Sequence, residues 1–174
     1  MPELFPNPDT PSRRSSETTI LETPICSIKT GPVTNRAGTI RKNVYWFDFP
    51  DWVNIVALTP IDEIILIKQF RYGSKRDELE IPGGMLEQGE SPLVGGCREL
   101  LEETGYGGAA PRIIGSVCPN PAIQGNRCFT ILVEQAVPTA PPRLDDMEDI
   151  EVIPTPYHQI DRMLTTGAIS HGLV

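Results

Sequence analysis

The middle of the chain alternates short apolar, β-branched runs with clusters of turn-forming residues. Pro50-Asp51, the turn around Pro60-Ile61-Asp62 and Pro82-Gly83-Gly84 separate such runs, because proline and glycine interrupt a strand pattern. The pattern predicts strands over residues 39–48, 52–58, 64–67, 78–81, 112–118, 127–134 and 150–153.

Two helices are predicted from the residues at their ends. The first has Ser91 as N-cap, Pro92 at the first helical position and Gly105 after the last turn. The second has Thr155 and Pro156 in the same roles and is expected to end near residue 167. Strands, a central helix, further strands and a terminal helix indicate a mixed α/β sandwich, not a regular βαβ alternation.

Both ends of the sequence are less regular. Residues 1–19 are rich in proline, serine and charge, which predicts a loose arm that either wraps a partner subunit or is a disordered tail. Ser170 resembles a helix start, yet the residues from there to Val174 are too few to hold a helix. We therefore expect a shortened or disordered C-terminal end.

Composition and charge narrow the class of protein. The 174 residues suit one compact domain, and 39% hydrophobic with 22% charged residues indicates a globular fold. A net charge of −8 argues against a nucleic-acid surface. The sequence shows no apolar run of the roughly 20 residues that span a bilayer and no export signal, so a cytoplasmic protein without a membrane partner is expected. Four widely spaced cysteines are expected to be reduced, mostly buried packing residues and not a zinc site.

The first predicted helix carries an acidic face. Glu99, Glu102 and Glu103 fall together at spacings i, i+3 and i+4, where like charges repel and oppose the helix dipole. Because stability gives no reason for this arrangement, we expect it to bind a hard divalent cation such as Mg²⁺, which takes carboxylates, waters and substrate phosphates; a solvated acidic face is the alternative. The opposite, apolar face comprises Leu93, Val94, Cys97, Leu100, Leu101 and Thr104.

The turn before this helix adds two elements. The backbone at Gly83 has no Cβ in the way, so its carbonyl is a candidate further metal ligand. Arg98 is placed to pair with Glu90 and to fix the intervening loop against the helix. The inner pair Gly95-Gly96 is unfavourable in a helix and is expected to permit close packing on a neighbouring strand.

Written out, these residues resemble the signature of the Nudix hydrolases: Gly84-x5-Glu90-x7-Arg98-Glu99-Leu100-x-Glu102-Glu103-x-Gly105. Every charged and glycine position is filled, and Tyr106 stands where the family has an aliphatic residue. The resemblance implies a Nudix-type α/β/α sandwich around a mixed sheet and hydrolysis of substituted nucleoside diphosphates with Mg²⁺, or Mn²⁺ as a substitute. It also implies that Glu99 and Glu103 are the core metal ligands, with Glu102 and the Gly83 carbonyl as further ligands, and that Arg98 belongs to the catalytic set.

Two segments upstream of this signature, residues 67–72 and 78–84, resemble the corresponding segments of the ADP-ribose and nucleoside-diphosphate-sugar pyrophosphatases. Pro121 adds to this resemblance, because that branch has a proline at the same distance after the closing glycine of the signature. By this resemblance, Arg71 clamps the substrate phosphates, or else is a surface arginine paired with Asp77 or Glu78. Glu80 holds the signature loop or a substrate hydroxyl, or else points outward from its strand.

The same branch supplies an acid from a later loop. Within residues 145–151 we expect Glu148 to be the general base, with Asp146 and Asp149 as further candidates, although a mobile acidic loop is an equal alternative. Gln124 and Asn126 stand near an acid position of many ADP-ribose enzymes. Because both are neutral, we expect them to contact sugar hydroxyls or a base edge, without strict ADP-ribose specificity.

A nucleobase needs an aromatic surface. Trp46 and Tyr45 are the first candidates and Trp52 is the third, with core or dimer packing as the alternative. Residues 1–38 are expected to form an arm and strands that make a homodimer, and residues 39–174 the Nudix domain. We expect hydrolysis of nucleoside diphosphate sugars; the alternatives are hydrolysis of nucleoside triphosphates or dinucleoside polyphosphates, and a ligand sensor without catalysis.

Overall fold

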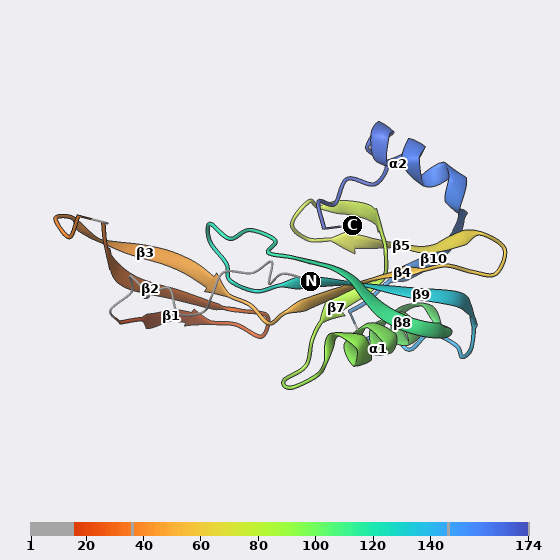
Figure 1. Cartoon of the computed structure of the whole chain (residues 1–174), viewed down its shortest axis with the longest axis horizontal. Helices are drawn as coiled ribbons and strands as arrows, with labels where there is room; N and C mark the ends of the chain where they lie inside the picture. The colour runs from red at the N-terminus through yellow and green to blue at the C-terminus, as the bar shows by residue number, and fades with distance from the viewer. Residues whose placement is uncertain (1–15, 36, 146, 174) are drawn as a thin grey trace. The chain divides into compact units, whose positions relative to one another are not determined.

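A computed structural model describes residues 16–35, 37–145 and 147–173, and its backbone divides into two compact units (Figure 1). The first unit comprises residues up to Phe49 together with Asn120–Gly125, and the second comprises Pro50–Pro119 and the residues from Asn126 onward. Asp146 and most of the predicted N-terminal arm lie outside the described residues.

The first unit contains an antiparallel three-stranded sheet in the order β1-β2-β3. Its strands are β1 (Thr18–Glu22), β2 (Ser27–Thr34) and β3 (Arg41–Asp48). The Asn35 side chain fixes the turn before β3, since its Oδ1 accepts hydrogen bonds from the backbone N–H groups of Thr39 and Ile40. Strand β1 begins within the last two residues of the segment predicted as an arm. The strand predicted from residue 39 is β3, which begins two residues later, at Arg41.

The second unit is built on two sheets, β10-β5-β6 and β7-β4-β9-β8. In chain order its elements are β4 (Trp52–Ala57), β5 (Glu63–Arg71), β6 (Arg76–Glu80), β7 (Gly83–Met85), α1 (Pro92–Thr104), β8 (Tyr106–Val117), β9 (Cys128–Pro138), β10 (Ile150–Pro156), a 3₁₀ turn (Tyr157–Gln159) and α2 (Ile160–Thr166). Strands β4 and β9 are parallel, and the other pairs are antiparallel. The predicted mixed α/β architecture is confirmed.

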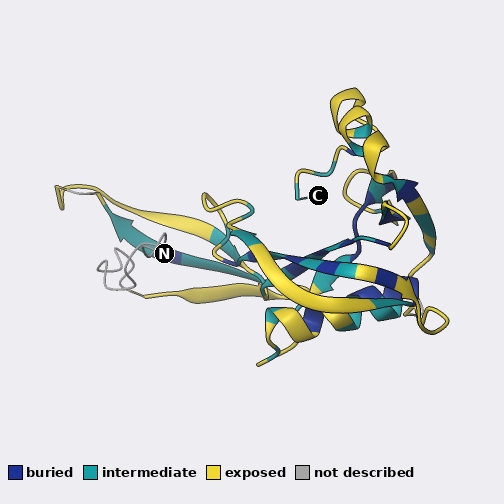
Figure 2. Ribbon diagram, turned by 45° about the vertical axis from the view of Figure 1, so that its right-hand side comes forward, coloured by how far each residue is buried: buried dark blue, intermediate teal, exposed yellow. Residues whose placement is uncertain are grey.

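Buried side chains of the second unit form two clusters on its strands, as the dark blue segments of Figure 2 show. One cluster joins β4, β9 and α1 through residues such as Val53, Ile131 and Leu100, each at most 1% exposed. The other lies around Leu66 and Ile81. Most of β8 is exposed. No helix within the described ranges has the length and apolar character needed to cross a membrane.

Helix α1 has the predicted ends, and glycines bring it close to the sheet. Ser91 caps it by accepting a hydrogen bond from the Val94 N–H, and Gly105 ends it with φ 73°. A Cβ on Gly96 would lie 2.9 Å from Cγ1 of Ile131, so only glycine allows this approach. The predicted close packing on a strand is confirmed for Gly96, whereas Gly95 approaches Leu86 and Glu90 of the loop before the helix.

The buried face of α1 differs from the predicted apolar face. Leu93, Val94 and Cys97 are exposed, whereas Gly95, Gly96, Leu100, Glu103 and Thr104 are buried. Because the sheet approaches along the glycines, the face that it covers includes Glu103. The cysteines also differ from expectation: Cys97 and Cys118 are exposed and only Cys128 is buried, although all four are free thiols.

The predicted start of the second helix is wrong. Thr155 and Pro156 belong to β10, where they pair with Ile64 and Glu63 of β5, and α2 begins at Ile160. A proline is tolerated there because it lies at the end of an edge strand. The predicted end is confirmed, since Gly167 closes α2 with φ 76°.

Candidate active site

The acidic residues of α1 are partly buried. Glu103 is 3% exposed, and its Oε2 accepts a hydrogen bond of 2.9 Å from the N–H of Gly83 in β7. Burial raises the pKa of Glu103 to about 8, and the charges of Glu99 and Glu148 act in the same direction. Burial also raises the pKa of Glu99. Placing these carboxylates together is therefore electrostatically unfavourable without a cation.

Strand β7 approaches α1 closely beside these carboxylates. A Cβ on Gly84 would lie 2.3 Å from Oε1 of Glu99, so a side chain there would displace the glutamate. The Pro82-Gly83-Gly84 turn thus serves two purposes: it gives Glu103 a backbone donor, and it leaves room for Glu99. Both glycines adjoin the cavity described below.

Arg98 organises the carboxylates of the helix. Its Nε and Nη2 donate to the two oxygens of Glu90, each at 2.9 Å, and its Nη1 donates to Glu99 and Glu102 at 3.0 Å. Nη2 also donates to the Met85 carbonyl at 3.2 Å. The predicted Arg98–Glu90 pair is confirmed, and it ties the loop before α1 to the helix. Glu102 is the most exposed of the three α1 glutamates, with 42% of its side chain accessible.

The loop acid Glu148 is exposed. Its charge raises the pKa values of both Glu99 and Glu103, which places it within electrostatic reach of the acidic residues of α1. Its Oε2 accepts a 3.0 Å hydrogen bond from the Asp145 N–H, which closes a local turn. Asp149 acts instead on Lys68. Of Glu148 and Asp149, the two predicted loop acids in the described residues, Glu148 is therefore the one whose charge acts on Glu99 and Glu103.

Arg71 and Glu80 form a two-point ion pair. Arg71 Nε lies 2.9 Å from Glu80 Oε1, and Nη2 lies 2.6 Å from Oε2. Glu80 is 2% exposed, whereas 42% of the Arg71 side chain is accessible. Arg71 therefore pairs with neither Asp77 nor Glu78, and Glu80 does not point outward from its strand. Arg71 also lowers the pKa of Glu103, which shows that it lies within electrostatic reach of the acids.

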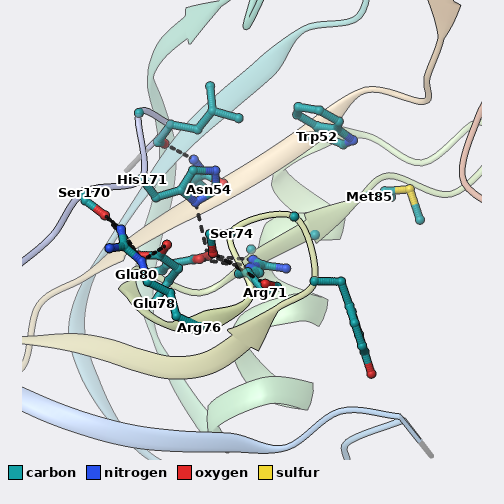
Figure 3. A pocket seen from close by; sticks show the side chains of 16 residues that line it. Trp52, Asn54, Arg71, Ser74, Arg76, Glu78, Glu80, Met85, Ser170 and His171 are labelled. Carbon is teal, nitrogen blue, oxygen red and sulfur yellow. Dashed lines mark hydrogen bonds and ion pairs between the residues drawn. The ribbon is translucent and has the colours of Figure 1, made fainter.

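A cavity of about 580 Å³ opens beside this ion pair. In the view of Figure 3 the charged groups Arg71, Glu80 and Glu78 gather on one side, and Trp52 and Met85 lie on another. The cavity therefore combines a guanidinium group, a type of group that suits anionic oxygens, with an apolar wall, and ligand sites commonly share this composition. Trp52, the third aromatic candidate of the sequence, lines it.

The other predicted substrate residues lie elsewhere in the chain. Tyr45 and Trp46 are on β3 and Gln124 is in the loop of the first unit. Asn126 is 5% exposed, and its Nδ2 donates to the Pro50 carbonyl at 3.1 Å, which holds the start of β4. Substrate contacts of all four stay predictions.

Several cavity residues escaped sequence reasoning. Asn54, Ser170 and His171 line the cavity but belong to no motif. Ser170 and His171 reach it only because the chain after α2 returns to β6, and no local pattern signals that return. Asn54 sits at a polar position of β4 with no feature that marks it as functional.

The residues present suit a divalent metal, although they do not form a finished cage. Within the described parts of the chain, no three His, Cys, Asp or Glu side chains converge as a metal site. Arg98 donates to both Glu99 and Glu102. The buried, destabilised carboxylate of Glu103 and the adjacent Gly83 backbone supply hard oxygen donors of the kind that Mg²⁺ takes, together with waters and substrate oxygens.

The signature predicted a mixed sheet and a helix that carries clustered glutamates. The structure has this arrangement, with Arg98 bound to two of the glutamates and the third, Glu103, buried. The sequence profile of the NUDIX domain matches residues 49–172, and the chain belongs to this family. The chain is 36% identical over 114 residues to the ADP-sugar pyrophosphatase of Mus musculus, covering 62% of this chain and 52% of the relative. It is 36% identical over 105 residues to the ADP-ribose pyrophosphatase of Bacillus subtilis, covering 60% and 57%.

A solved structure described as an ADP compounds hydrolase has the same fold. It aligns with a TM-score of 0.76 and 20% identity, over 87% of this chain and 82% of the other. The chain spans about half the length of the curated relatives named above.

Proposed function

We propose that this protein hydrolyses the pyrophosphate bond of nucleoside diphosphate sugars, such as ADP-ribose or GDP-mannose, to a nucleoside monophosphate and a sugar phosphate. The observation that supports this most is the buried Glu103 beside Glu99. These two carboxylates contact Gly83 and Gly84, which line the same cavity as Arg71. Two relatives are named for pyrophosphatase activity on ADP-sugar and ADP-ribose.

In this proposal Glu99, Glu103, Glu102 and the Gly83 carbonyl hold Mg²⁺, with Mn²⁺ as a possible substitute. When bound, the metal neutralises diphosphate charge and acidifies the attacking water. The buried position of Glu103 favours this role, because a carboxylate that is costly to ionise alone gains most from a cation.

The other residues bind and orient the substrate. Arg71 uses its fork of Nε and Nη2 for Glu80, and its Nη1 donates a charge-assisted hydrogen bond to a phosphate oxygen. Trp52 offers a face to the base. Glu148 takes the proton of the attacking water as general base, and Arg98 keeps the helix carboxylates in register.

A product assay tests the proposal. Purified protein with Mg²⁺ is incubated with ADP-ribose, GDP-mannose, UDP-glucose and nucleoside triphosphates, and the products are separated by chromatography. We expect monophosphate from the sugar nucleotides and none from the Glu103→Gln variant. Pyrophosphate release from triphosphates alone indicates the other hydrolase activity. Tight binding of a nucleotide sugar without turnover indicates a sensor, and either result contradicts the proposal.

The first unit supports a further proposal, that the protein forms a homodimer. Strand β1 is at the edge of the described sheet, with Ile20 and Leu21 54% and 50% exposed, and Tyr45 of β3 is 63% exposed. An exposed apolar edge strand favours pairing with another chain. Light scattering should show a dimer that Ile20→Asp converts to a monomer; a monomeric wild type contradicts this. The cytoplasmic location stays a prediction.

A further inference from the structure

The chain segment after α2, residues 169–173, is fixed to the wall of the cavity. Ile169 is 5% exposed and packs in the cluster around Leu66. Ser170 Oγ donates to Glu78 Oε2 at 3.0 Å and accepts from Arg76 at 2.8 Å. Farther on, Asn54 Nδ2 donates to the Leu173 carbonyl. These contacts anchor the backbone on both sides of His171.

His171 faces the carboxylate that holds the substrate-binding arginine. Its Nδ1 lies 3.3 Å from Glu80 Oε2, the same oxygen that Arg71 Nη2 contacts at 2.6 Å (Figure 3). This Nδ1 atom is buried and makes no hydrogen bond of full geometry within the described residues. A buried ring nitrogen is costly without a polar partner, and Glu80 is the partner that it faces.

We propose that His171 is a positioning residue for substrate binding: it holds Glu80 from one side, and Glu80 holds the guanidinium of Arg71 toward the cavity. The kinetic consequence rests on the proposed function, whereas the positioning itself does not. A carboxylate contacted from two sides rotates little, so Arg71 is ordered before the diphosphate arrives. Preordering of a binding group reduces the entropy that binding must overcome.

Without His171, Glu80 keeps Arg71 as its partner in the cavity wall, and its side toward residue 171 opens to water. Arg71 then samples more orientations, so the entropy cost of ordering its side chain is added to substrate binding. We therefore expect the loss in KM and not in kcat, because the contact acts on the ground-state and transition-state complexes alike. A purely structural role for His171 would lower the fraction of active protein and leave KM unchanged.

Three substitutions separate the hydrogen-bonding atom from the bulk of the ring. His171→Asn keeps an N–H donor close to the position of Nδ1. His171→Gln moves its amide toward the position of Nε2, and His171→Leu keeps volume but has no donor. His158→Ala is the matched control, because His158 is the only other histidine of the sequence and is exposed in the 3₁₀ turn.

In the kinetic assay with ADP-ribose and Mg²⁺, we expect KM to rise about tenfold in the Leu and Gln variants, with kcat within about twofold. The Asn variant should stay within about threefold of wild type, and His158→Ala should be unchanged. An unchanged KM in the Leu and Gln variants, equal losses in Asn and Gln, or a loss in kcat alone would overturn the proposal. If the Leu variant does not fold, the comparison of Asn with Gln decides.

A second readout needs no substrate. The Arg71 Nε–H donates to Glu80, and its exchange with water is followed by NMR in the ligand-free protein. We expect slow exchange in wild type and the Asn variant and several-fold faster exchange in the Leu variant. Equal exchange in all three contradicts the positioning role. If the wild type hydrolyses no nucleotide sugar, the proposed function fails, while this measurement still decides the role of His171.

Discussion

Replacing Glu103 by glutamine should make the metal-free protein more stable while removing its activity. Glu103 is 3% exposed, and the charges of Glu99 and Glu148 add to the cost of ionising it. Glutamine has nearly the same shape and can still accept the hydrogen bond from Gly83. The substitution therefore removes a buried negative charge and little else.

The size of the effect follows from the pKa of Glu103. Burial raises it from an ordinary 4.5 to about 8, so the folded state binds this proton more tightly than the unfolded state. The contribution of this group to the free energy of unfolding is therefore fully present below about pH 4.5, and it is lost as the pH rises toward 8. At about 1.4 kcal/mol per pKa unit the ceiling is about 5 kcal/mol. Because relaxation and water entry reduce the penalty of a buried charge, we expect about 2 kcal/mol.

Urea unfolding in EDTA, followed by circular dichroism at pH 4 and pH 8.5, measures this difference. Glu103→Gln should unfold at higher urea than wild type at pH 8.5, and the two should nearly agree at pH 4, where the carboxyl group is mostly neutral in both states. Added Mg²⁺ should stabilise the wild type and not the variant. A variant that is less stable than wild type at pH 8.5 would refute the view that this carboxylate is unfavourable without a cation.

Three further predictions concern binding, catalysis and packing. Arg71→Lys should raise KM about tenfold in steady-state assays, because an ammonium group cannot contact Glu80 and a phosphate in fork geometry; an unchanged KM removes Arg71 from the site. Glu148→Gln should lower kcat at least about tenfold, while Asp161→Asn on α2 leaves it unchanged, and equal rates exclude Glu148 as the base. Gly96→Leu should lower the free energy of unfolding by about 2 kcal/mol, because even a Cβ would crowd Ile131; an unchanged urea midpoint contradicts the close packing.

Features set by neighbouring residues were predictable from the sequence. The ends of α1 follow from Ser91, Pro92 and Gly105, whose capping roles depend on the adjacent backbone only. The pairing of Arg98 with Glu90 could also be predicted, because Glu90 directly precedes the N-cap of the helix that carries Arg98. Helical spacing placed the three glutamates together, although it did not show that Glu103 is on the buried face.

Features set by tertiary contacts were not predictable in this way. Strand β10 runs through Pro156 because β5 pairs with it, although Thr155-Pro156 resembles a helix start. Strand β8 begins at Tyr106, six residues before the predicted strand, because β9 supplies hydrogen-bond partners to a bulged stretch rich in glycine and alanine. His171 reaches Glu80 only through docking of a distant segment, which no pattern of spacing encodes.

We propose that Glu99 and the buried Glu103 of α1 hold a divalent cation at the diphosphate of the substrate. A crystal soaked in MnCl₂ with a non-hydrolysable ADP-ribose analogue tests it directly through the anomalous signal of manganese. We expect a peak at coordination distance from carboxylate oxygens of Glu99 and Glu103 and from the analogue's diphosphate. Bound analogue with no peak at these two residues, or with manganese only elsewhere, would contradict it.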